Sequence, residues 1–141
     1  MFNWLKNFIL SAGGHPTSDN MQRPEMDQAE KTIGIHLYSN FGSDYSVISN
    51  EISDDIIKQA IAKLDWQNGF HQVICTIEPG VLMEVGGSLN PTDGLSAMYR
   101  NYDDGVESVI AEPPETIDQM IDIIVLFSKG DDAWSKQYVF S

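Results

Sequence analysis

The stretch from residue 70 to residue 111, FHQVICTIEPGVLMEVGGSLNPTDGLSAMYRNYDDGVESVIA, decides the fold of this chain. Four segments of it are rich in β-branched and aromatic residues and predict strands: Phe70 to Glu78, Val81 to Gly86, Leu95 to Tyr102 and Val106 to Ala111. Short turn signals, Glu78-Pro79-Gly80 and Asp103-Asp104-Gly105, separate neighbouring segments. Because such turns join sequential antiparallel strands, the stretch predicts an antiparallel meander.

One helix is predicted before this meander in the sequence and another after it. Ser53 offers an N-cap, and the apolar residues that follow recur at helical spacing, which predicts a helix from about residue 53 to Trp66. After Pro113-Pro114, Thr116 and Gln119 form a capping-box signature that opens a second helix, and Gly130 ends it. We therefore expect one α+β domain over residues 31–141, an antiparallel sheet packed by two main helices.

Shorter signals lie toward both ends of the chain. Thr32 to Tyr38 alternates as a strand does, with His36 on the opposite face from Ile35 and Leu37, and Tyr45 to Ile48 predicts a second short strand. Tyr138 and Phe140 share one face of the segment from Trp134 to Phe140, which predicts a last strand that returns to the sheet.

The first 30 residues divide into two parts. Residues 1–12 place Phe2, Leu5, Phe8 and Ile9 at helical spacing and predict a short N-terminal helix. We expect it to dock on the domain or on a partner rather than to anchor the chain to a membrane surface. Residues 13–30 are rich in Gly, Pro and polar residues and predict a linker or mobile loop.

The charge of the chain limits its partners. The 141 residues include 21 acids but only 8 Lys and Arg residues, a net charge of −13. Such a field repels phosphate backbones and anionic membranes, so we expect neither nucleic acid nor membrane as a partner. It favours a basic protein or a cation, although ordinary solubility explains the same charge. No segment approaches the roughly 20 apolar residues that a membrane span requires. The chain has one cysteine, Cys75, in an apolar run, which is compatible with a reducing compartment, so we expect a cytoplasmic protein.

The sequence contains no pattern that we assign to catalysis, a cofactor or a metal. His15, His36 and His71 lack the spacing of metal ligands, and we expect each at the surface or at a sheet edge. Val85-Gly86-Gly87-Ser88 lacks the Lys and Ser or Thr that follow in a phosphate loop, so it predicts a wide turn. Asn101, Asp103 and Asp104 fit a hairpin turn better than a calcium loop.

Acidic residues concentrate in the second half of the chain and suggest a partner interface. On these residues alone an ordinary solvated face explains the acids slightly better than an interface does, and for Trp134 a core or capping role is favoured over a contact with a partner. A negative surface of this kind would steer the approach of a partner rich in Lys and Arg. The candidate interface residues are Asp103, Asp104, Glu107, Glu112, Glu115, Asp118, Asp122 and Trp134.

The order of these segments resembles that of small immunity proteins of bacterial polymorphic-toxin and contact-dependent inhibition systems, and of related small bacterial families of unknown function. The resemblance covers about residues 51 to 140 and rests on ISDDIIKQAIAKLDW, FHQVICTIE, GVLMEVGGS, GLSAMYRNYDDG, PPETIDQMIDIIVLFSKGDDAW and QYVF. Its most telling pieces are Gly86-Gly87, Tyr99-Arg100, Gly130 and Trp134. For Tyr99 and Arg100 we expect opposite faces of the sheet, one packed and one paired with an acid.

This resemblance implies an α+β domain that binds and neutralises a cognate toxin, commonly an intracellular enzyme such as a nuclease, without catalysing a reaction. Two other classes remain open. One is a small-molecule-binding or enzymatic domain with a pocket between sheet and helix. The other is a structural or oligomeric subunit that pairs through a strand edge or the N-terminal helix.

Overall fold

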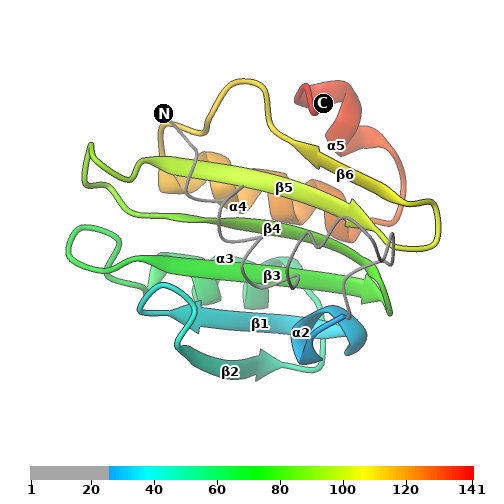
Figure 1. Cartoon of the computed structure of the whole chain (residues 1–141), viewed down its shortest axis with the longest axis horizontal. Coiled ribbons are helices and arrows are strands. Elements are labelled where there is room, and N and C mark those ends of the chain that lie inside the picture. The colour runs from blue at the N-terminus through cyan, green and yellow to red at the C-terminus, as the bar shows by residue number, and fades with distance from the viewer. Residues whose placement is uncertain (1–25) are drawn as a thin grey trace, which may run out of the picture.

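A six-stranded antiparallel sheet forms the centre of the computed structural model, which describes residues 26–141 (Figure 1). The strand order across the sheet is β2-β1-β3-β4-β5-β6. The strands are β1 (Gly34–Ser39), β2 (Asp44–Ser49), β3 (His71–Glu78), β4 (Val81–Gly87), β5 (Leu95–Asn101) and β6 (Val106–Val109). The predicted α+β class is confirmed, and the N-terminal helix predicted over residues 1–12 lies outside the described residues.

The four strands predicted from residues 70–111 form the meander β3-β4-β5-β6. Each pairs with the next in antiparallel register, for example Ile74 with Glu84 and Glu84 with Met98. Gly80 and Gly105 adopt φ values of +84° and +66° in the two predicted turns, a backbone region that favours glycine. The turns therefore fix the register of the hairpins.

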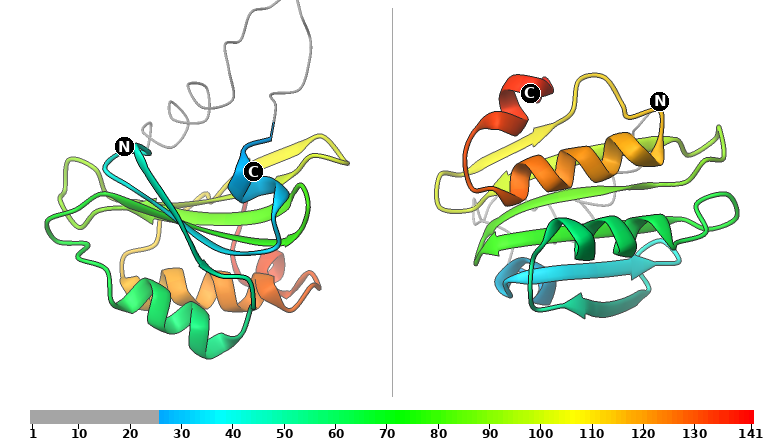
Figure 2. Two further views of the ribbon diagram at one scale, coloured as in Figure 1. Left: turned by 90° about the horizontal axis from the view of Figure 1, so that it is seen from below. Right: turned by 180° about the vertical axis from the view of Figure 1, so that it is seen from behind.

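Helices α3 (Asp54–Ala62) and α4 (Ile117–Ser128) cover one face of this sheet (Figure 2). Both predicted caps form: the Ser53 side chain accepts from the backbone N–H of Ile56, and Thr116 and Gln119 make a reciprocal capping box. Helix α3 ends earlier than predicted, because Trp66 leaves the helix and donates its indole N–H to the carbonyl of Ile61 at 2.8 Å. An apolar core fills the layer between these helices and the sheet.

The predicted closing strand is wrong over most of its length. Residues Ala133–Gln137 form a short helix, α5, in which the ring of Trp134 packs on Phe127 and Tyr99. The backbone carbonyl of Trp134 accepts from the N–H of Tyr138 at 3.0 Å, so hydrogen bonds within this segment replace those of a strand ladder. Only the end of the segment reaches the sheet, where Phe140 forms an isolated bridge with Ile110.

The predicted linker, residues 13–30, is wrong at its end. Gln28–Lys31 form a short helix, α2, with Ala29 and Glu30 buried against the sheet. Asp27 and Glu30 close a capping box that stabilises this single turn. Residues 13–25 lie outside the described part of the chain. Within residues 26–141, no helix has the length and apolar character needed to cross a membrane.

Candidate functional site

The two faces of the sheet differ in chemistry, because successive residues of a strand point to opposite sides. Val73, Cys75 and Val85 point toward α3 and α4 and belong to the apolar core. Gln72, Glu84 and Arg100 lie on the other face, which the short helix α2 touches but neither main helix, α3 or α4, covers (Figure 2). We call it the helix-free face with reference to those two main helices. Polar groups therefore gather on one side of the sheet.

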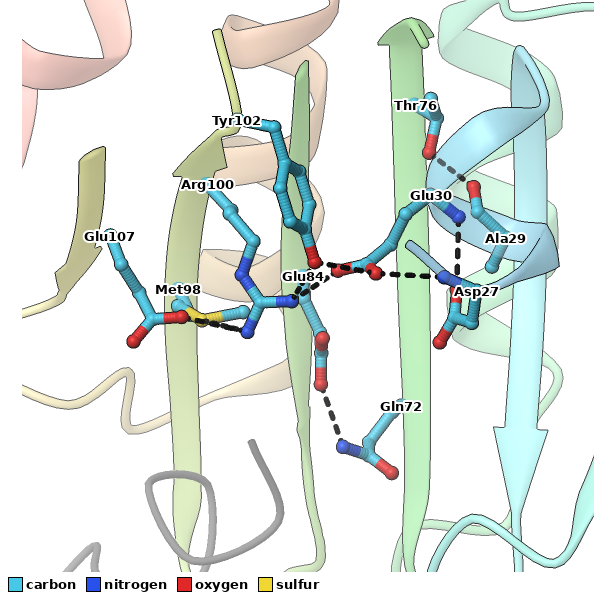
Figure 3. A network of polar contacts seen from close by, with 10 residues as sticks. All are labelled: Asp27, Ala29, Glu30, Gln72, Thr76, Glu84, Met98, Arg100, Tyr102 and Glu107. Carbon is cyan, nitrogen blue, oxygen red and sulfur yellow. Dashed lines mark hydrogen bonds and ion pairs between the residues drawn. The ribbon is translucent and has the colours of Figure 1, made fainter. Parts of the chain in front are cut away.

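Arg100 lies at the centre of a polar network on the helix-free face (Figure 3). Its guanidinium forms an ion pair with Glu30 of α2 and donates to the Tyr102 hydroxyl at 2.9 Å. The other terminal nitrogen, Nη2, pairs with Glu107 of β6 at 2.8 Å. Tyr99, the preceding residue, packs on Phe127 and Trp134 on the opposite face. The prediction that these neighbours separate into a packed and an acid-paired residue is confirmed.

Glu30 connects α2 to the strands. Its carboxylate accepts from the Tyr102 hydroxyl at 2.8 Å and from the backbone N–H of Asp27 at 3.2 Å. Thr76 of β3 holds the same turn by donating to the carbonyl of Ala29 at 2.6 Å. Burial raises the pKa of Glu30, although the Arg100 guanidinium opposes the shift. The network thus fixes a chain segment that lies seventy positions from Arg100 in the sequence.

Glu84 is the least satisfied acid of this face. It is 4% exposed and receives a hydrogen bond from the Gln72 amide at 2.6 Å. Among residues 26–141 it forms no salt bridge, because the terminal nitrogens of Arg100 pair with Glu30 and Glu107. Burial raises the pKa of Glu84 to about 7, and the more distant Arg100 charge opposes that shift. Glu84 therefore titrates near neutral pH.

Three further polar atoms beside this acid are buried without a hydrogen-bond partner. They are Gln72 Oε1, Ser96 Oγ and Arg100 Nε. A buried polar atom without a partner costs about 1–3 kcal/mol, so such atoms are few in native proteins. Their position around Glu84 marks this part of the helix-free face as a candidate site.

This network was not predicted from the sequence. Glu30 falls inside the predicted linker, and Glu84 is one of 21 acids with no motif around it. One signal was available: Glu84 interrupts the apolar segment VLMEVGG, and Gln72 and Arg100 are further polar residues within the neighbouring strands. A charged residue in the middle of a buried strand indicates a partner or a site.

The prediction for His36 is wrong, because this side chain is fully buried. Strand β1 lies between β2 and β3 and therefore has no free edge. The His36 ring donates from Nε2 to the carbonyl of Thr32 at 2.7 Å, and Nδ1 lies 2.9 Å from the Tyr45 hydroxyl. His71 is half-buried and contacts Ser39, whereas His15 lies outside the described residues.

The seven acids of the predicted interface are all exposed, but they do not form one cluster. Asp103 and Asp104 lie in the β5–β6 turn, while Glu115 and Asp118 lie at the start of α4, toward the opposite end of the sheet (Figure 1). Glu107 is engaged with Arg100. The acids thus follow the β6 side of the molecule from one end to the other.

Two of the predicted interface residues have structural partners as well. Asp122 accepts a hydrogen bond from the Tyr138 hydroxyl at 2.6 Å. Trp134 is half-buried and contacts Tyr99, Phe127 and Phe140, so its ring contributes to the packing of α5. Its role as an anchor for a partner stays a prediction.

The layer between sheet and helices offers little chemistry. Its described core is apolar, and burial raises the pKa of the Cys75 thiol to about 12, which disfavours the reactive thiolate. Across residues 26–141, no three His, Cys, Asp or Glu side chains are grouped in a way that would hold a metal ion. The polar chemistry of the described chain lies instead on the helix-free face.

Comparisons with known proteins identify no relative. No family model, no curated protein and no solved structure matches this chain. A functional proposal therefore depends on the residues and contacts of the chain itself.

Proposed function

We propose that this chain is a non-catalytic, acidic protein-binding module that neutralises a cognate bacterial toxin by covering its active site or an adjacent surface. One observation carries the proposal. Residues 103–122, which we call the acidic segment, hold seven exposed acids and no Lys or Arg. The order of the sequence segments, which resembles that of immunity proteins, supports the same assignment.

The acidic segment suits a toxin that acts on nucleic acid. The active site of a nuclease must attract phosphates and is therefore surrounded by Lys and Arg. Exposed carboxylates would occupy those positions in place of the substrate phosphates and would accelerate the encounter by electrostatic attraction. Such an inhibitor needs no catalytic group of its own, and it would act in the cytoplasm, where the toxin meets its substrate.

The two ends of the acidic segment give two possible contact surfaces. One is the β5–β6 turn with Asp103 and Asp104, and the other is the start of α4 with Glu112, Glu115 and Asp118. None of these five acids forms a salt bridge within residues 26–141. Reversing their charges therefore breaks no ion pair of the described residues, so a loss of affinity reports on the contact with the partner.

The test uses the catalytic domain encoded by a toxin gene adjacent to the gene for this chain. We expect the purified proteins to form a stable complex and the chain to protect cells that produce the toxin. Reversal to Lys at either Asp103 and Asp104 or at Glu112, Glu115 and Asp118 should weaken binding by about tenfold or more, consistent with roughly 1.4 kcal/mol or more. The end of the acidic segment at which charge reversal weakens binding is the contact surface.

Glu51→Lys with Glu78→Lys provides the matched control, because both acids are exposed and lie outside the acidic segment. This variant should bind and protect as the unmodified chain does. The proposal fails if the unmodified chain neither binds the toxin nor protects cells, or if reversal at both ends of the segment leaves binding unchanged.

A further inference from the structure

The polar groups around Glu84 surround a position on the sheet that no side chain occupies. Glu84 pairs with Met98 across β4 and β5 and with Ile74 across β3 and β4, so Gln72 and Ser96 are its diagonal neighbours on the same face. Between those two residues lies Gly86, which pairs with both. A carboxylate, an amide and a hydroxyl thus surround a position that has no side chain.

Gly86 allows this arrangement. A Cβ atom at residue 86 would lie 2.8 Å from Cγ of Gln72 and 2.7 Å from the carbonyl oxygen of His71. Any larger residue would therefore displace the Gln72 side chain, which leans across the glycine to donate to Glu84. With its amide nitrogen used in this way, Gln72 leaves Oε1 without a donor.

Two of the three unpartnered atoms, Gln72 Oε1 and Ser96 Oγ, flank Gly86 and can accept a hydrogen bond, whereas the third, the donor Arg100 Nε, belongs to a residue paired with Leu82 on the other side of Glu84. Gln72 Oε1 accepts only, Ser96 Oγ can accept, and ionised Glu84 accepts on both oxygens. Within residues 26–141 the local charge is also unbalanced, because Glu30, Glu84 and Glu107 face one cation, Arg100. The missing group is therefore a hydrogen-bond donor with positive charge.

We infer that Glu84, Gln72 and Ser96 form a site for one basic side chain, the guanidinium of an Arg or the ammonium of a Lys, supplied by a partner protein. This inference rests on the proposed function and names the chemistry of the partner that reaches the helix-free face. A basic side chain would donate to Gln72 Oε1 and Ser96 Oγ and place its charge against Glu84. It would complete three groups that the described residues leave incomplete.

Agmatine, which carries a guanidinium on a four-carbon chain, probes the site without the toxin. At pH 8, above the pKa of about 7 of Glu84, we expect saturable shifts of the backbone NMR signals of Gln72, Glu84 and Ser96 in the full chain. Butanamide, a neutral probe of similar length, should give none. Glu84→Gln should weaken agmatine binding by about tenfold or more, the scale of one charge-assisted contact.

Glu112→Gln is the matched control, because it removes an exposed acid outside the site and should leave agmatine binding unchanged. Ser96→Ala gives an independent variant if Glu84→Gln does not fold, and it should also weaken binding. Unsaturable shifts in the unmodified chain, or equal affinity in the variants, overturn the site.

The toxin domain then tests the source of the basic side chain. Loss of affinity for the toxin in Glu84→Gln, but not in Glu112→Gln, supports a partner side chain. If agmatine binds and toxin affinity is unchanged in Glu84→Gln, the assignment to a partner is overturned. Failure of the proposed function is distinct, since the unmodified chain would then not bind the toxin at all.

Discussion

The two faces of the sheet are both buried, but they are stabilised in different ways. On the side of α3 and α4, apolar residues such as Ile124 and Phe127 interdigitate with the strands. On the helix-free face, Arg100 and the acids around it form a network in which each charge depends on another. An apolar core tolerates small adjustments, whereas removing one member of a buried ionic network leaves an unpaired charge. The largest mutational effects are therefore expected on the face with fewer apolar contacts.

Arg100→Met should produce the largest loss. It leaves the buried carboxylate of Glu30 without its counter-ion and should lower the free energy of unfolding by about 3–5 kcal/mol. Denaturant titration followed by circular dichroism measures this loss. The double variant Arg100→Met with Glu30→Gln removes both charges and should recover part of the stability. A loss below about 1 kcal/mol in the single variant would contradict a structural role for the network.

Ile124→Ala tests the other face. Ile124 is fully buried between α4 and the sheet, so truncation should cost about 2–5 kcal/mol through lost burial and the cavity that remains. Ile33→Ala is the control, since Ile33 is 46% exposed and should change stability by no more than about 0.5 kcal/mol. The same denaturant titration applies. Equal effects of the two variants would show that burial does not control stability on this face.

The free energy of unfolding should depend on pH through Glu84, a residue of the helix-free face. The pKa of Glu84 rises from 4.5 to about 7 on folding, so the folded chain binds its proton more tightly than the unfolded chain. Its contribution is complete below pH 4.5 and is lost as pH rises toward 7, by on the order of 3 kcal/mol. Unfolding titrations of the unmodified chain and Glu84→Gln isolate this contribution as their difference. A pH-independent difference would contradict the shift.

Thr116→Ala should produce the smallest effect. It removes the hydroxyl that accepts from the N–H of Gln119 at 3.1 Å and should cost about 1 kcal/mol. Thr116→Ser keeps the hydroxyl and should behave as the unmodified chain does in thermal unfolding. Equal losses in the two variants would place the effect in the methyl group rather than in the cap.

The sequence predicted the elements whose signals are local. The turns at Gly80 and Gly105, the Ser53 and Thr116 caps and the strands between residues 70 and 111 all follow from neighbouring residues. The end of the chain was harder, because Trp134 to Phe140 has both a helical and an alternating pattern, and packing of Trp134 on Phe127 favours the helix.

The helix-free face was not predictable in the same way. Glu30 and Arg100 approach each other only after β1, β3, β4 and β5 have assembled, and no spacing in the sequence records that contact. Alternation along β4 places Glu84 on one face but does not show whether that face is solvated or buried. The acidic segment was visible from composition, yet its division between two ends of the molecule required the topology.

The two edges of the sheet have unequal capacity for self-association. Residues 139–141 bond to Val109 and Ala111 at distances of 2.7–3.0 Å and occupy the outer side of the chain where β6 ends. Strand β2 forms the other edge, with Val47 47% exposed. Growth of a fibre by strand addition needs an available edge on both sides of every subunit. Because residues 139–141 cover the β6 side from Val109 onward, strand addition there is left only the short stretch of residues 106–108, whereas β2 offers the whole length of an edge strand.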